Sequence, residues 1–152
     1  MTKGLAQLMT NVHERTPQIG DVYLINFGSE GCGNEQQGWR PGVVFQNNLG
    51  NKYSPNVIAL PLTSSLKKRN QPTHVVITAE DSGLARDSMV LCENPESISK
   101  ARLGNYLTTI PEKYMSQIAI ANLLATSAIS FVEPDLLMSV WLEAASLNAN
   151  IS

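Results

Sequence analysis

The chain has 152 residues, of which 43% are hydrophobic, and this size suits a single globular domain. A domain of this length buries about 68–70% of its unfolded surface, so it requires neither disulfides nor a metal to fold. The formal net charge of −2 excludes a globally basic nucleic-acid binder. Cys32 and Cys92 lack a CxxC spacing, which argues against a thiolate metal site and against a disulfide framework.

Charge is distributed unevenly along the chain. Residues 40–113 hold nine basic and six acidic residues, whereas residues 114–152 hold three acidic residues and no basic residue. Because phosphates are attracted to positive charge, a polyanion site is expected in the middle of the chain.

The N-terminal residues bear on the compartment of the protein. Residues 1–18 are mixed polar and lack the apolar core of a signal peptide, and they are expected to form a flexible or weakly helical leader. No apolar run approaches the ~20 residues that span a bilayer. A cytoplasmic protein without a membrane partner is therefore expected.

Five short strands are predicted after the leader. Runs rich in β-branched and aromatic residues, separated by turn residues, predict strands at 22–27, 41–46, 56–63, 73–78 and 88–93. The intervening glycine-rich and polar segments predict a loop at 28–38, a turn at 47–51 and a loop at 67–72. Short strands in this pattern favour a small antiparallel barrel over a parallel sheet.

Two helices are predicted after the strands. Thr109 and Glu112 have the spacing of a capping box, and Pro111 suits a first helical turn, so the first helix should run to about Ala125. Its expected apolar face consists of Tyr114, Ile118, Ala121 and Ala125.

The second helix should begin near Pro134, where Glu133 and Asp135 favour the helix dipole. Its apolar face consists of Leu137, Val140, Trp141 and Ala144. This face is expected to pack on the body of the protein or across a dimer, because the helix lacks the Lys and Arg of a membrane-surface helix.

Several segments between residues 20 and 125 resemble MazF/PemK-type mRNA interferases, and their order and spacing together are specific. In chain order they are Gly20-Asp21-Val22-Tyr23, Asn34-Glu35-Gln36-Gln37-Gly38-Trp39-Arg40-Pro41, Val43-Val44-Phe45-Gln46-Asn47, Gly50-Asn51-Lys52-Tyr53-Ser54-Pro55, Leu62-Thr63-Ser64, Pro72-Thr73-His74-Val75 and Arg86-Asp87-Ser88.

This resemblance implies a mainly β, α+β fold: a small twisted antiparallel SH3-like barrel of the MazF/PemK/CcdB type with C-terminal helices. It divides the chain into a leader at 1–18, an endoribonuclease domain at 19–127 and a helical extension at 128–152. It further implies a homodimeric toxin that cuts single-stranded RNA sequence-specifically, without a metal or other cofactor, and that a cognate antitoxin neutralises.

The chemistry of RNA cleavage narrows the candidate residues. When the 2′-OH attacks the adjacent phosphate, an enzyme must deprotonate the hydroxyl, neutralise the phosphorane and protonate the leaving oxygen. A histidine pair is rejected, because His13 lies in the leader and His74 in a predicted strand. Arg40 is preferred, because a guanidinium is permanently charged and grips two phosphate oxygens at once. The resemblance also assigns catalysis to the arginine of this Arg-Pro pair.

Thr63 and Glu35 complete the predicted catalytic set. The Thr63 hydroxyl, at the end of a strand, can donate to a non-bridging phosphate oxygen, and the resembling family uses this threonine together with the arginine. Glu35 lies in the loop before Arg40, where its carboxylate would orient the guanidinium or act as the base, and both roles stay open.

Polar residues around these three are expected to bind RNA, since amides pair with base edges and lysines track phosphates. The predicted set is Asn34, Gln36, Gln46, Asn47, Lys52, Ser64, Lys67 and Asn94, with Lys68 and Arg69 beside Lys67. For the basic triplet, a solvated loop is the alternative interpretation.

The chain departs from the family pattern in three places, the first of which is an altered loop at Ser29-Glu30-Gly31-Cys32-Gly33. Asn34 stands where serine is usual, and Asn94-Pro95-Glu96 replaces the common Gln-Ile-Arg, so that Glu96 removes an expected RNA contact. The altered segment at 94–96 leaves a non-catalytic RNA-binding regulator as one alternative function. The other alternative is a fold relative that poisons a partner protein such as gyrase, because gyrase-poisoning toxins have the same architecture.

Overall fold

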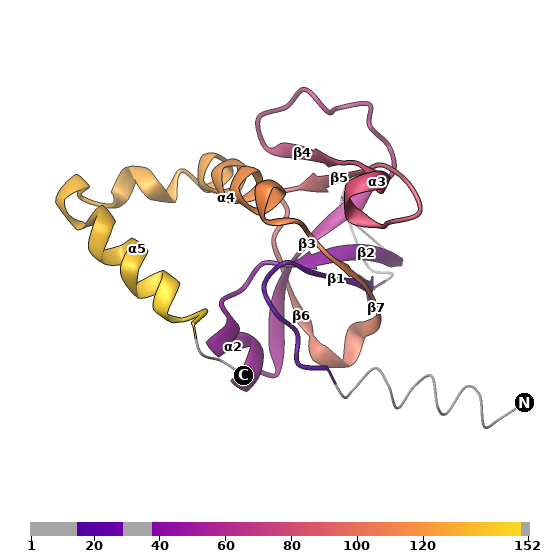
Figure 1. Cartoon of the computed structure of the whole chain (residues 1–152), viewed down its shortest axis with the longest axis horizontal. Coiled ribbons are helices and arrows are strands. Elements are labelled where there is room, and N and C mark those ends of the chain that lie inside the picture. The colour runs from indigo at the N-terminus through magenta and orange to yellow at the C-terminus, as the bar shows by residue number, and fades with distance from the viewer. Residues whose placement is uncertain (1–14, 29–37, 150–152) are drawn as a thin grey trace, which may run out of the picture.

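A computed structural model describes residues 15–28 and 38–149 of the chain, and the predictions on Asn34, Glu35 and Gln36 fall outside these ranges. Seven strands form one sheet, and helices follow toward the C-terminus (Figure 1). The strands are β1 (Asp21–Asn26), β2 (Trp39–Val44), β3 (Asn56–Thr63), β4 (His74–Ile77), β5 (Ser88–Leu91), β6 (Glu96–Ser99) and β7 (Leu103–Thr109). The helices are α2 (Asn48–Tyr53), α3 (Ala79–Ser82), α4 (Glu112–Thr126) and α5 (Leu137–Ser146), with short 3₁₀ turns η1 (Lys100–Arg102), η2 (Ala128–Phe131) and η3 (Pro134–Leu136).

The antiparallel β fold with C-terminal helices is confirmed. The strands follow the order β4-β5-β3-β2-β1-β7, and β6 pairs with the first half of β3. All strand pairs of the described residues are antiparallel. Because β4 and β7 end this path without pairing with each other, the sheet is open rather than a closed barrel.

All five predicted strands are present, and β3 has the predicted limits. Strands β6 and β7 were missed. The β7 sequence includes Gly104 and Asn105, which have low β propensity. It forms a strand because it pairs with β1 from Asp21 opposite Thr109 to Ile25 opposite Leu103, with two register shifts. Tertiary pairing therefore overrides local preference here.

Two local predictions are wrong. The predicted turn at 47–51 is part of helix α2, whose first turn is capped by the Asn47 side chain accepting from the Gly50 N–H. The predicted capping box is absent: α4 starts at Glu112 without a side-chain cap, and the Thr109 hydroxyl donates to Asp21 Oδ1 at 2.9 Å instead. Asp21 is fully buried, so its carboxylate needs hydrogen-bond donors, and the Thr109 hydroxyl bonds to it instead of capping α4.

The sheet is buried on both faces. One cluster lies between the sheet and α4 and consists of Val22, Val43, Leu60, Leu62, Val75, Ile77, Val90, Cys92, Ile110, Tyr114, Ile118 and Ala121. The other covers the opposite face and consists of Tyr23, Ile25, Phe27, Val44, Val57, Ala59, Ile98 and Leu103. The predicted face of α4 is confirmed at Tyr114, Ile118 and Ala121 but not at Ala125, which is exposed.

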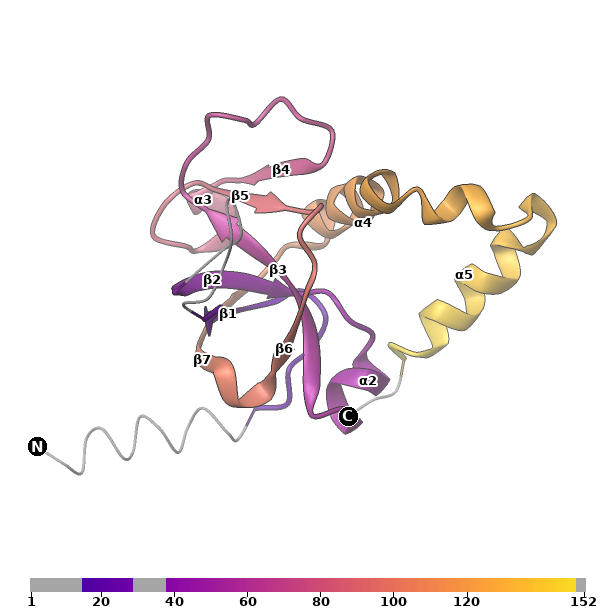
Figure 2. The same ribbon diagram turned by 180° about the vertical axis from the view of Figure 1, so that it is seen from behind.

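Beyond α4 the chain leaves the body of the protein, and α5 lies apart from the sheet (Figure 2). Its end returns to α2, where the Leu49 N–H donates to the Leu147 carbonyl at 3.1 Å. The predicted apolar face of α5 does not pack on the body, because Trp141 is 65% exposed and the other three members of that face are exposed as well. Packing across a dimer stays a prediction.

Candidate active site

The two central catalytic candidates come from adjacent strands. In the β2–β3 pair, Gly42 lies opposite Pro61. Continuing this register by two residues on each strand places Arg40 opposite Thr63, just beyond the last paired residues. Residues that oppose each other in register point to the same face of a sheet, with Cβ atoms roughly 5 Å apart when pairing continues. The register therefore brings Arg40 and Thr63 to one face at one end of the sheet.

This end of the sheet is open to solvent. Arg40 is exposed and Thr63 is partly exposed. The Thr63 hydroxyl oxygen accepts a hydrogen bond from the Ser65 N–H at 3.1 Å, which fixes the oxygen while its proton remains the group that can donate. Neither side chain is sealed in the core, so both are accessible from solvent.

Gly42 explains why β2 fits here. A Cβ at this position would lie 2.7 Å from Ile25 Cδ1 and 3.0 Å from Phe27 Cζ. These side chains belong to the cluster beneath β2, so a larger residue would require Ile25 and Phe27 to shift beneath the strand that carries Arg40 two positions away.

The loop before Arg40 is closed at its base. The Phe27 N–H donates to the Gly38 carbonyl at 2.9 Å, and the Gly38 N–H donates to the Gly28 carbonyl at 2.6 Å. Gly38 has a φ of +72°, a backbone conformation that favours glycine. Arg40 thus follows a fixed point of the chain, whereas Glu35 lies outside the described residues.

Positive charge gathers beyond the end of β3. The predicted phosphate-binding residues Lys67, Lys68 and Arg69 are all exposed in the loop that follows Thr63, and Ser64 is exposed beside it. Phosphate binding by these residues stays a prediction.

Arg86 is an additional cation that we did not assign from the sequence. It is exposed two residues before β5, and the start of β5 pairs with the end of β3 through Met89 opposite Thr63. Its carbonyl accepts from the Ser88 hydroxyl at 3.1 Å, which fixes the backbone. The pairing of β3 with β5 brings the segment before β5 close to Thr63, and this strand register is not visible in the sequence.

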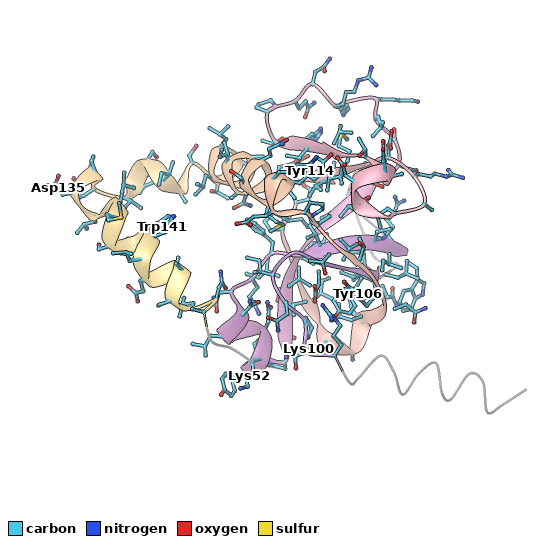
Figure 3. All side chains as sticks on the ribbon, in the orientation of Figure 1. Lys52, Lys100, Tyr106, Tyr114, Asp135 and Trp141 are labelled. Carbon is cyan, nitrogen blue, oxygen red and sulfur yellow. The ribbon has the colours of Figure 1, made fainter. Side chains whose placement is uncertain are left out.

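Three predicted RNA-binding residues lie at the other end of β3. Gln46 donates to the Asn56 carbonyl at 3.2 Å, and Asn56 is seven residues from Thr63, roughly 23 Å at about 3.3 Å per residue. The Asn47 side chain caps α2, and Lys52 lies on the same helix (Figure 3). Gln46 and Asn47 therefore have structural contacts, and the structure does not bring this group to Arg40.

His74 and Asn94 are fixed in the fold next to the basic loop, which consists of residues 64–73 between β3 and β4. The side chain of His74 is 3% exposed, and its two ring nitrogens contact the Lys68 carbonyl and the Glu93 carboxylate. Asn94 is partly buried in the turn after β5, where its N–H donates to the Leu91 carbonyl at 3.2 Å.

The large pKa shifts belong to groups that stabilise the fold. Burial raises the pKa of the Cys92 thiol to about 12, so this residue is not a thiolate nucleophile at neutral pH. Burial likewise raises the pKa of Tyr23 to about 12. Hydrogen bonds from Tyr114, then Lys113, lower the pKa of Asp81 to about 2.

The described residues contain neither a candidate metal site nor a candidate membrane-spanning helix. Within residues 15–28 and 38–149, no three His, Cys, Asp or Glu side chains gather in a way that could hold a metal ion. In the same part of the chain, no helix has the length and apolar character needed to cross a bilayer.

Two bacterial endoribonucleases are similar to this chain in sequence. Endoribonuclease EndoA of Bacillus subtilis is 38% identical over 112 residues, which cover 74% of this chain and 96% of EndoA. Endoribonuclease MazF of Staphylococcus saprophyticus is 42% identical over 99 residues, which cover 65% of this chain and 82% of that protein.

Solved structures agree. A mycobacterial endoribonuclease in complex with its cognate antitoxin is similar with a TM-score of 0.62 and 28% identity, covering 74% of this chain and 96% of that chain. MazF from Deinococcus radiodurans shares the fold with a TM-score of 0.65 at 23% identity, covering 75% of this chain and 99% of that one.

A family model for PemK-like, MazF-like toxins of type II toxin–antitoxin systems matches residues 18–124, which include both Arg40 and Thr63. The chain therefore belongs to the PemK/MazF family of type II toxins.

Proposed function

We propose that this MazF-type endoribonuclease toxin cuts single-stranded RNA by attack of the 2′-OH on the adjacent phosphate, with Arg40 and Thr63 stabilising the transition state. The observation that carries the proposal is the register of β2 and β3, which directs both side chains to one face at the solvent-exposed end of the sheet.

Each residue has a distinct part in this mechanism. The Arg40 guanidinium would bind two phosphate oxygens and offset the negative charge that grows on the phosphorane. The Thr63 hydroxyl, whose oxygen is fixed by the Ser65 N–H, would donate to a non-bridging oxygen. Glu35 stays the candidate that orients Arg40 or takes the proton of the 2′-OH.

The substrate would extend from this pair toward the basic loop. Lys67, Lys68 and Arg69 would contact phosphates, and Arg86 is added to them because its backbone is fixed beside the end of β3. Gln46, Asn47 and Lys52 would bind RNA only at the far end of β3, so their contribution is a separate proposal.

The proposal includes partners. A similar mycobacterial structure is a complex with its cognate antitoxin, which supports a cognate antitoxin for this chain as well. A homodimer in the cytoplasm is proposed on the family resemblance. Poisoning of gyrase and non-catalytic RNA binding are the alternatives that the family relatives do not favour.

Cleavage of a long RNA in excess EDTA tests the proposal. The purified chain is expected to give discrete fragments with 2′,3′-cyclic phosphate or derived 3′-phosphate ends and with 5′-hydroxyl ends. A folded protein that leaves the RNA intact would overturn the proposal, and a gyrase supercoiling assay with the same sample would then test the first alternative.

A further inference from the structure

His74, one member of the histidine pair that we rejected for catalysis, contacts the basic loop. Its side chain is nearly fully buried, at 3% exposure, at the start of β4. Nδ1 lies 2.7 Å from the Lys68 carbonyl oxygen, and Nε2 lies 2.6 Å from Glu93 Oε1. Because a carbonyl oxygen only accepts, Nδ1 donates to Lys68. A single ring therefore joins the middle of the basic loop, residues 64–73, to the turn after β5.

The Glu93 side of this contact is itself anchored. The carbonyl of the preceding Cys92 accepts from Asn122 Nδ2 of α4 at 3.1 Å, and the Cys92 N–H donates to the Thr73 carbonyl at 3.0 Å. Since Cys92 is fully buried, the turn that carries Glu93 is attached to the core. The bond from His74 to Lys68 thus attaches an exposed loop to a part of the protein that is itself anchored to the core.

The two ends of the loop are attached to strands: the Ser65 N–H donates to Thr63 Oγ1 at 3.1 Å, and the Thr73 carbonyl accepts from the Cys92 N–H at 3.0 Å. The His74 N–H also donates to the Gln71 carbonyl at 3.1 Å.

The middle of the loop has two further backbone bonds, both within the loop itself. The Arg69 N–H donates to the Leu66 carbonyl at 3.2 Å, and the Gln71 N–H donates to the Lys68 carbonyl at 3.3 Å. Both bonds connect residues three apart, so they shape the turn without setting its position on the sheet. The hydrogen bond from the His74 ring to the Lys68 carbonyl, by contrast, links the middle of the loop to a side chain of β4.

We propose that His74 is a positioning residue that sets the basic loop for RNA binding, with Glu93 orienting its ring. The inference rests on the proposed function, because it assigns the loop to RNA phosphates. With the loop fixed at Lys68, its three cations are held in place without the entropic loss that ordering a free loop on binding would add.

Two substitutions separate the two bonds of the ring. An asparagine amide reaches the place of Nδ1, so His74→Asn keeps a donor for the Lys68 carbonyl. A glutamine amide reaches the place of Nε2, so His74→Gln keeps only the bond to Glu93. Both variants remove the same ring, and each serves as the packing control of the other.

Trypsin tests the position of the loop without RNA, because it cuts after the three basic residues at 67–69. We expect His74→Gln to be cut there roughly five- to tenfold faster than the unaltered chain, the effect of removing one hydrogen bond, and His74→Asn within about twofold. Equal cleavage in the two variants would overturn the role of the Lys68 bond.

Steady-state RNA cleavage then tests the link to function. For His74→Gln, KM should rise by about the same factor while kcat stays within about twofold, because Arg40 and Thr63 are untouched. The slope of log KM against log salt should become shallower by about one for each phosphate that the loop no longer binds. His74→Asn should restore KM to within about twofold.

The outcomes distinguish the two proposals. If the unaltered chain cuts no RNA, the proposed function fails, whereas trypsin still reports on the loop. If trypsin finds the loop released in His74→Gln but KM and its salt dependence stay unchanged, His74 serves stability alone and the positioning role is wrong. A fall in kcat without a change in KM would also contradict it.

Discussion

Two regions of the molecule differ in the exposure of their apolar side chains: the sheet together with α4, and the C-terminal segment that follows α4. The strands and α4 bury theirs in two clusters, whereas residues 128–146 expose large apolar side chains, among them Phe131 at 88% and Trp141 at 65%. The family match ends at residue 124, close to where this change occurs. The proposed chemistry lies in the matched part, on the sheet, and the assignment of residues 128–152 to a separate extension stays a prediction.

The largest effect that separates the two regions is expected from Arg40→Ala. Loss of the charge that faces the phosphorane should lower kcat by about a thousandfold or more, with the fold intact by circular dichroism. Trp141→Ala is the matched change in the C-terminal segment and should leave RNA cleavage unaltered. Wild-type cleavage by the Arg40 variant would remove Arg40 from the mechanism.

Thr63→Val sharpens the same contrast, because valine keeps the shape of threonine and deletes the hydroxyl. We expect kcat to fall roughly a hundredfold. Thr126→Val, at the end of α4, deletes a hydroxyl that donates to the Asn122 carbonyl and should leave kcat unaltered. Similar rates for the two variants would make Thr63 a structural residue.

Stability should also differ between the regions. Ile118 is fully buried against the sheet, so Ile118→Ala should lower the free energy of unfolding by about 2–5 kcal/mol in urea denaturation. Trp141→Ala should change it by less than about 0.5 kcal/mol in the monomer, because most of the indole is exposed. A larger loss for Trp141 would show that its face is covered in solution.

The smallest effect is expected at the contact between α3 and α4. The folded pKa of Asp81 is about 2, below its ordinary value of 3.8, so the contact stabilises the fold above pH 3.8 and this contribution is lost as the pH falls toward 2. Tyr114→Phe removes the largest cause of the shift. The stability difference between wild type and variant should therefore be present near neutral pH and shrink between pH 4 and 2, as urea denaturation at several pH values can measure.

Local sequence signals were sufficient where burial follows the strand period. Alternating and apolar runs predicted β3 within its observed limits, and helical spacing predicted the buried face of α4 at Tyr114, Ile118 and Ala121. Such patterns record which side of an element faces the core, and that information is local.

Long-range contacts explain the errors. Thr109 has the spacing of a helix cap, yet it bonds to Asp21, 88 residues away in the sequence. Gln46 and Arg40 are close in the sequence, but a strand directs them to opposite ends of the sheet. The pairing of Arg40 with Thr63 came from the family resemblance, since spacing alone does not fix a strand register. The division of the chain at residues 18 and 127 stays a prediction.

The central claim is that the RNA supplies its own nucleophile at a site formed by Arg40 and Thr63. Once the cleavage position is mapped, an oligonucleotide with a single 2′-deoxy nucleotide on the 5′ side of the scissile phosphate tests this directly. In EDTA the protein should cut the all-ribose oligonucleotide and leave the 2′-deoxy one intact while still binding it. Cleavage of both at similar rates would contradict the account.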